Sequence, residues 1–158
     1  MKLYHGSNIE IDKIDLNKSR NFKDFGRAFY LSDDEQQAWE RAYTAITMWG
    51  GEPKVTAFEF DEHNIALKEL KVLRFEAYTE DWADFIFVNR NRTKPAYKHD
   101  YDIVYGPIAN DRIGEQIALL KGGYITKERF LRKLKLMRGI TYQYAFCTEV
   151  AISKLKKL

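Results

Sequence analysis

Three short segments of the chain carry side chains that can hold a small molecule. The first is Tyr4-His5-Gly6-Ser7, where a histidine ends a short strand and the two smallest turn residues follow it. Small residues let a ligand approach the backbone closely, and the imidazole can hydrogen-bond a hydroxyl group. Taken alone, the same tetrapeptide is also typical of a capped turn without a ligand.

The other two segments lie on predicted strands. Gly26-Arg27-Ala28-Phe29-Tyr30-Leu31-Ser32 places an aromatic pair directly before a predicted helix. In Thr141-Tyr142-Gln143-Tyr144-Ala145-Phe146, Gln143 lies on one face of an otherwise apolar strand. A polar amide on a buried strand needs a hydrogen-bond partner, which is either a neighbouring residue or a ligand. Taken singly, the aromatic pair also fits ordinary core packing.

These segments must be positioned by strands that are interrupted by helices without regular βαβ alternation, which favours an α+β fold. The expected strands cover residues 3–6, 28–31, 55–60, 72–75, 102–108 and 141–148. The expected helices begin at the Ser32–Glu35 capping box, at Thr79, at Asn110 or Asp111, and at Thr126. No repeat or proline-rich linker divides the 158 residues, so we expect a single domain over residues 1–158.

Composition excludes several classes of protein. The 45% hydrophobic content suffices for a core, and one cysteine rules out a disulfide framework or a multi-cysteine zinc site. No apolar run approaches the roughly 18 residues of a membrane span, and the N-terminus lacks a secretory signal, so we expect a cytoplasmic protein. The histidines lack metal-ligand spacing, so no metal is expected. The common phosphate-loop, zinc-protease and serine-hydrolase motifs are absent.

Together, the three segments resemble the ADP-ribosyltransferase superfamily, in its diphtheria-toxin and poly(ADP-ribose)-polymerase branch. The motif of that branch is a His, a Tyr and a Glu on three separate strands, and His5, Tyr30 and Gln143 match its positions. The chain is similar in particular to small bacterial members, some of which are suspected toxin–antitoxin components. The resemblance implies a split, strongly bent β-sheet with helices packed around an NAD cleft.

The resemblance also implies roles for individual residues, with NAD as co-substrate. His5 would hydrogen-bond the ribose 2′-hydroxyl, the Gly6 backbone would hold the nicotinamide carboxamide, and Tyr30 would stack on the nicotinamide ring. A second stacking aromatic would come from the following helix. The residues expected to bind NAD are His5, Gly6, Ser7, Tyr30, Trp39 and Tyr43.

Gln143 departs from the motif, which has a Glu at that position. Breaking the nicotinamide–ribose bond builds positive charge on the sugar, and a carboxylate stabilises that charge. Losing one such electrostatic contact typically costs about 3–4 kcal/mol, or roughly 100- to 1000-fold in rate. Four other carboxylates are candidates to enter the site: Asp33, Glu35, Asp111 and Glu115.

The expected activity is therefore mono-ADP-ribosyl transfer to an unknown acceptor, which is a protein, a nucleic acid or a small molecule. Polymer synthesis depends on the missing Glu in this superfamily. Whether the chain is an active enzyme stays open, because a non-catalytic NAD- or ADP-ribose-binding module would keep the same pocket. Asn110 and Asp111 are expected at the rim that touches the acceptor.

Charge is unevenly distributed along the chain. Residues 121–158 hold ten lysines and arginines against two glutamates, whereas the preceding residues hold 16 basic and 21 acidic side chains. The basic helix expected over residues 126–138 indicates two alternatives, namely a nucleic-acid-binding domain or the docking of a small acidic protein such as an antitoxin. The polar loop Asn89–Lys94 is expected to contact the NAD diphosphate or a nucleic-acid acceptor.

Overall fold

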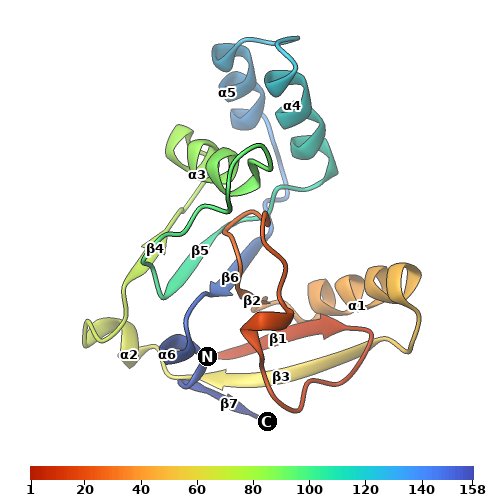
Figure 1. Cartoon of the computed structure of the whole chain (residues 1–158), viewed down its shortest axis with the longest axis vertical. Coiled ribbons are helices and arrows are strands. Elements are labelled where there is room, and N and C mark those ends of the chain that lie inside the picture. Colours follow the sequence, from red (N-terminus) through yellow and green to blue (C-terminus); the bar gives the residue numbers. More distant parts are fainter.

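The computed structural model describes residues 1–158 as an α+β protein with two β-sheets and six α-helices (Figure 1). The predicted α+β class is therefore confirmed. The strands are β1 (Lys2–Ser7), β2 (Phe29–Leu31), β3 (Lys54–Phe60), β4 (Val72–Arg74), β5 (Ile103–Pro107), β6 (Tyr142–Phe146) and β7 (Leu155–Lys157). The helices are α1 (Glu35–Trp49), α2 (His63–Ala66), α3 (Glu80–Arg90), α4 (Asp111–Lys121), α5 (Lys127–Lys135) and α6 (Glu149–Ile152), with one 3-10 turn, η1 (Leu16–Lys18). No helix has the length and apolar character needed to cross a membrane.

The two sheets differ in their strand order and are hydrogen-bonded to each other through a single residue pair. One sheet has the order β1-β3-β7, and the other has the order β2-β6-β5-β4. Tyr4 N donates to Ser32 O at 2.7 Å, and Ser32 N donates to Tyr4 O at 2.9 Å. This isolated antiparallel bridge is the only pairing between β1 and the segment that contains β2, so the sheets diverge on the far side of it.

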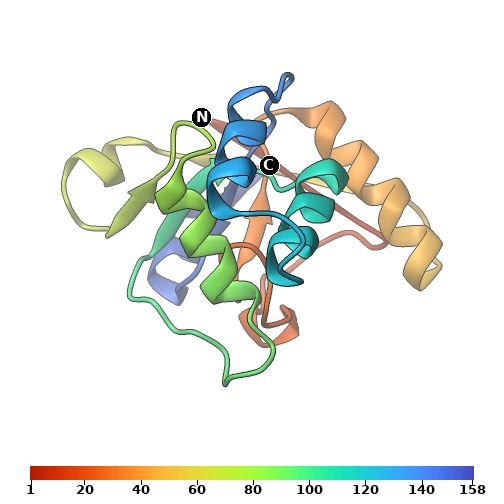
Figure 2. The ribbon, with the colours of Figure 1, turned by 90° about the horizontal axis from the view of Figure 1, so that it is seen from above.

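Two hydrophobic clusters lie on the two faces of the four-stranded sheet. Val104 and Ala145 pack with the helices α3, α4 and α5, whereas Ile103 and Phe146 pack against the three-stranded sheet. The alternation follows from the strand period of two, which sends neighbouring side chains to opposite faces. Seen from above, α3, α4 and α5 cover one side of the molecule together (Figure 2). The sheet is thus buried on both faces, and its strands are apolar accordingly.

Helix α1 lies along β1 and begins two residues later than the capping box predicts. Asp34, rather than Ser32, is the N-cap, and its carboxylate accepts from Gln36 N and Gln37 N. Ser32 Oγ instead accepts from Asp34 N at 3.0 Å, which fixes the turn before the cap. Both side chains satisfy backbone donors that would otherwise be unpaired at the start of the helix.

Gly6 explains how closely α1 approaches β1. A Cβ atom at this position would lie 1.8 Å from Ala38 O and 2.9 Å from Ala42 N, which are backbone atoms of the helix. Ala38 and Ala42 are themselves buried, so the helix presents only small side chains to the strand. A side chain at position 6 would point into α1, so glycine is needed here for the packing of α1 on β1.

The sequence analysis did not predict three short elements, α2, α6 and β7. The predicted strand over residues 141–148 ends at Phe146, because Thr148 caps α6 by accepting from Ala151 N. The helix expected over residues 126–138 is confirmed as α5 but ends at Lys135. A four-residue helix and a three-residue edge strand carry too few residues to show a hydrophobic period.

We expect opposite effects of Gly→Ala at two positions. Gly6→Ala should lower the free energy of unfolding by at least about 1–3 kcal/mol, since the new methyl group has no room against the α1 backbone. Gly114→Ala in α4 should raise it by about 0.5–1 kcal/mol, because no atom lies within 4 Å of the added Cβ and alanine favours a helix. Urea unfolding of both variants checks this, and equal stabilities would contradict the close packing at Gly6.

Candidate functional site

His5 interrupts the pairing between β1 and β2. In continued antiparallel register the next hydrogen-bonded pair after Tyr4 and Ser32 would be Gly6 and Tyr30. Instead, His5 Nδ1 lies 2.7 Å from Tyr30 O, so the imidazole takes the place of a backbone donor. The ring also stacks on Phe29, with centroids 4.3 Å apart. The site begins where this side chain separates the two strands.

The surroundings of His5 determine its protonation state and tautomer. A carbonyl oxygen only accepts, so Nδ1 carries the proton and Nε2 keeps a free lone pair. The pKa of His5 is lowered to about 4, chiefly by burial and also by the nearby cations Lys23 and Arg41. The hydrogen bond to Tyr30 O opposes this shift. His5 is therefore neutral at pH 7, and Nε2, which makes no hydrogen bond within the protein, can accept from a hydroxyl group.

The peptide groups of Gly6 are free at the same place. Backbone N–H and C=O groups of alternate residues in a strand point to the same side. Those of Tyr4 bond Ser32, so those of Gly6 point toward β2 as well, and the isolated bridge at Tyr4 shows that the pairing does not continue to them. An adjacent donor and acceptor thus face the gap in the pairing beside His5. Ser7, at the end of β1, donates from Oγ to Asn8 Oδ1 at 3.4 Å.

Tyr30 is held rigidly by the loop that precedes it. Its hydroxyl donates to Gly26 O at 2.7 Å and accepts from Phe25 N at 3.1 Å. Burial raises the pKa of Tyr30 well above its usual value, so the phenol stays protonated. Phe25 O accepts in turn from His99 Nε2 at 3.0 Å, which gives His99 a structural role. The ring of Tyr30 therefore has a single orientation.

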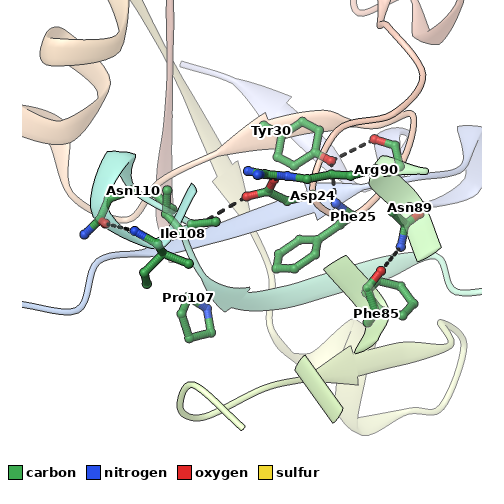
Figure 3. A network of polar contacts seen from close by, with 12 residues as sticks. Asp24, Phe25, Tyr30, Phe85, Asn89, Arg90, Pro107, Ile108 and Asn110 are labelled. Carbon is green, nitrogen blue, oxygen red and sulfur yellow. Dashed lines mark hydrogen bonds and ion pairs between the residues drawn. The ribbon is translucent and has the colours of Figure 1, made fainter. Parts of the chain in front are cut away.

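An ion pair fixes this loop to the helices (Figure 3). Arg90 Nε, at the end of α3, donates to Asp24 Oδ1 at 2.6 Å, and Ala109 N donates to Asp24 Oδ2 at 3.4 Å. Both side chains of the pair are mostly buried. Asn89, next to it, donates to Phe85 O, while its Oδ1 has no partner and lies 2.9 Å from where a Cβ on Gly26 would be. The sequence analysis missed Asp24 and was wrong to place Asn89 and Arg90 in a polar loop, because both residues end α3. The two partners of the ion pair lie 66 positions apart and share no local pattern.

The strand register places Gln143 on the same face as Tyr30. Tyr30 pairs with Ala145 across β2 and β6, and Gln143 lies two residues before Ala145, about 7 Å along the strand. On its other side Gln143 is opposite Gly106 of β5. Its amide makes no hydrogen bond with the protein, and Gln37 on α1 donates to the neighbouring Tyr142 O at 3.1 Å. The structure thus places Tyr30 and Gln143 on one face of neighbouring strands.

The four candidate carboxylates do not join these residues. All four side chains are exposed, and none hydrogen-bonds His5, Tyr30 or Gln143. Asp33 raises the pKa of Tyr105 and of Tyr144, so it lies near tyrosines whose strand positions face away from Gln143. Glu35 begins α1, and Asp111 and Glu115 lie on α4. Asn110 accepts from Ile113 N as the N-cap of α4, which gives it a structural role.

Lys23 and Arg41 lie near His5, and Arg20, whose guanidinium lies over the Trp49 ring, lies near Lys23. The sequence analysis did not identify these three cations. Lys23 Nζ lies 4.9 Å from the centroid of the Tyr30 ring, over its face. Burial lowers the pKa of Lys23 to about 8, and the positive charges of Arg41 and Arg20 add to this effect. None of the three forms an ion pair. Uncompensated, partly buried positive charge of this kind attracts an anion.

Trp39 and Tyr43 lie away from this group. Their rings are 38% and 57% exposed and contact each other on α1 at 6.3 Å. At 100° per residue they occupy the flank of α1 opposite Gln37 and Arg41, the two side chains that reach β6 and His5. The structure therefore does not bring either ring to Tyr30, and the helix position nearest the site is filled by an arginine.

Two surface hollows lie elsewhere. One of about 650 Å³ runs between β4 and α3, and one of about 670 Å³ lies between the end of α3 and the α4–α5 connection. Neither is lined by His5, Tyr30 or Gln143. The candidate site is therefore defined by side-chain geometry at the junction of the two sheets.

Comparison with known proteins gives one match. A family model described as "Protein of unknown function (DUF3990)" matches residues 1–157. No curated protein and no solved structure matches the chain. The family description assigns no activity, so the chemistry must be argued from the site.

The state of His5 can be tested by its pH dependence. Because burial lowers its pKa from 6.5 to about 4, the unfolded chain binds more protons than the folded one between these values. Stability should therefore fall by at most about 3 kcal/mol as the pH falls from 6.5 to 4. His5→Gln, which keeps a donor for Tyr30 O, should show a smaller loss. A ¹⁵N NMR titration showing a charged His5 at pH 6 would contradict this assignment.

Proposed function

The chain belongs to the DUF3990 family, and we propose that it is an NAD-dependent mono-ADP-ribosyltransferase. It would cleave the bond between nicotinamide and ribose and pass ADP-ribose to an acceptor. The observation that carries the proposal is the grouping of a neutral His5, the free peptide groups of Gly6, and the Tyr30 and Gln143 side chains where the sheets diverge. We interpret the two sheets as the split sheet of an ADP-ribosyltransferase.

The groups at the junction complement the nicotinamide riboside half of NAD. A carboxamide offers one acceptor and an NH₂ donor, and the adjacent N–H and C=O of Gly6 match both. The free lone pair of His5 Nε2 accepts the proton of a ribose hydroxyl. The rigid Tyr30 ring is a platform for a flat heterocycle, since its hydroxyl is fixed by two hydrogen bonds.

The cations complement the other half of NAD. Its diphosphate carries two negative charges, and three cations without ion pairs are available to it: Lys23 over the Tyr30 ring, and Arg41 and Arg20 near Lys23. In the free protein Lys23 covers the Tyr30 ring, so the nicotinamide can stack there only when Lys23 moves. We infer that the diphosphate draws the ammonium away, and that the cationic nicotinamide ring replaces one cation–π contact with another.

Cleavage of the nicotinamide–ribose bond then depends more on how the site positions NAD than on a negative charge that stabilises the sugar cation. The electron pair of the C–N bond leaves with nicotinamide, which becomes neutral, and the ribose becomes an oxocarbenium-like cation that the acceptor attacks while losing its proton. The Gln143 amide can hold a ribose hydroxyl but supplies no negative charge. Asp24, the carboxylate whose charge acts on Tyr30, is neutralised by Arg90. Slow turnover is expected as a result.

The same observation supports a second function, a non-catalytic NAD- or ADP-ribose-binding module. The site would then keep every binding group and lack only the carboxylate. The two functions differ in a single measurable event, the release of nicotinamide, so one assay separates them.

We expect the purified protein to release nicotinamide from NAD, and His5→Ala and Tyr30→Ala to abolish the release. Gln143→Glu should raise the rate roughly 100- to 1000-fold, because it restores charge stabilisation of the sugar cation. Gln36→Glu, an exposed change of the same kind on α1, is the matched control and should have no effect. Chromatographic quantification of nicotinamide measures all five proteins. NAD binding without release, in wild type and in Gln143→Glu, would favour the binding module, and no binding would refute both functions.

Lys23→Met should change the ligand preference of the site. Losing a charged contact to phosphate should weaken NAD binding by about tenfold or more, whereas free nicotinamide should bind at least as well once Tyr30 is uncovered. Since the pKa of Lys23 is about 8, the NAD affinity of the wild type should fall above pH 8, where the ammonium deprotonates, and that of Lys23→Arg should not. Lys18→Met, an exposed lysine in η1, is the control for calorimetric titration. Equal affinities of Lys18→Met and Lys23→Met for NAD would contradict the role of Lys23.

A further inference from the structure

A second concentration of positive charge lies on α5, at the far end of the molecule from β1 and β3 (Figure 1). Phe130 and Leu134 are buried beneath the helix. At 100° per residue, the opposite arc of this nine-residue helix holds Glu128 and three exposed basic side chains, and a fourth, half-buried basic side chain lies at its edge. The four basic side chains are Arg129, Arg132, Lys133 and Lys135, which we call the basic face of α5.

The four charges of the basic face have no partners in the protein. Lys127, on the flank of the same helix, pairs with Glu80 at 2.7 Å and with Asp84 at 3.2 Å. No side chain of the basic face forms an ion pair. Folding therefore gathers four positive charges beside the single negative charge of Glu128, and the remaining repulsion is a cost that an external polyanion would remove.

A hollow of about 670 Å³ lies at the start of α5, on the flank of the helix that carries Lys127. It is also lined by Asp84 and Phe87 of α3, by Leu120 and Lys121 of α4, and by residues 90–93. Among them, Arg92 and Lys121 form no ion pair. Arg92 lies over the Phe22 ring, 5.3 Å from its centroid, so its guanidinium is held in place. Arg92 belongs to the polar loop that the sequence indicates as a contact for phosphate groups.

The composition of this surface distinguishes between two classes of polyanion. An interface with an acidic protein has an apolar core, whereas a nucleic-acid interface is polar and strongly positive. The basic face carries no apolar side chain within α5, and the exposed Leu136 that follows the helix is a single apolar residue, too little for the apolar core of a protein interface. Tyr124, in the connection between α4 and α5, is 80% exposed, and an exposed aromatic ring is a platform on which a nucleic-acid base can stack.

We propose that the basic face of α5 and the adjoining hollow form a docking surface for single-stranded nucleic acid. The phosphates contact the four unpaired cations of α5, together with Arg92 and Lys121, and an unpaired base stacks on Tyr124. The surface is separate from the His5 and Tyr30 site, so this inference does not depend on the activity proposed for that site.

Fluorescence anisotropy with a labelled 20-nucleotide single strand tests the surface. With about six phosphate contacts, the logarithm of the affinity should fall with the logarithm of salt concentration with a slope near −4. Arg129→Glu, Arg132→Glu and Lys133→Glu combined should weaken binding at low salt by more than about 100-fold. The control combines Lys2→Glu, Lys13→Glu and Lys68→Glu, three exposed lysines outside ion pairs, with the same change in net charge. Equal losses in both variants would show a general charge effect and overturn the proposal, as would the absence of binding by the wild type.

Two further comparisons test the class of partner. Tyr124→Ala should weaken single-strand binding by roughly 5- to 100-fold and leave duplex binding unchanged, because a paired base cannot stack on the ring. A duplex that binds more tightly than the single strand, with Tyr124→Ala neutral, would overturn the single-strand assignment. A polyglutamate peptide of equal charge that binds as tightly would overturn it in favour of an acidic protein.

Discussion

One hydrogen bond, from His5 Nδ1 to the carbonyl of Tyr30, determines the geometry of the candidate site. It takes the place of the backbone bond that would have continued the pairing of β1 with β2, so the strands part after Tyr4 and Ser32. The same bond fixes the tautomer of His5 and leaves the Gly6 peptide groups unpaired. A buried imidazole that replaces a backbone donor thus creates, in one step, an acceptor, a donor and the opening in which they lie.

The opening persists because its two walls are held independently. On one side, Gly6 lets α1 contact β1 directly, so the strand cannot shift toward β2 without losing the helix. On the other side, the Asp24–Arg90 ion pair and the two hydrogen bonds of the Tyr30 hydroxyl tie the loop to α3 and to its own backbone. Such preorganisation is what a site needs when it lacks a charged catalytic group, because positioning then has to supply most of the rate enhancement.

Electrostatics separates the two proposed functions of the molecule. At the junction of the sheets, burial keeps His5 neutral and brings the pKa of Lys23 near 8, so the positive charge there is limited and sensitive to pH. On α5 the arginines and lysines are mostly exposed. A small anion fits the first setting, whereas a long polyanion fits the second, where many weak contacts add together.

The sequence by itself determined the α+β class, most of the longer elements, and the strands that carry His5, Tyr30 and Gln143. It could do so because hydrophobic period, caps and glycines act within a few residues of one another. It also indicated His5, Tyr30 and Gln143, since their identities are distinctive within their strands. Only the tertiary structure decided that Gly6 packs against a helix, that Arg41 rather than Trp39 or Tyr43 approaches the site, and that Lys23 covers Tyr30. These relations depend on which face of α1 meets β1 and on how a polar loop folds back, and neither is written in any local pattern of residues.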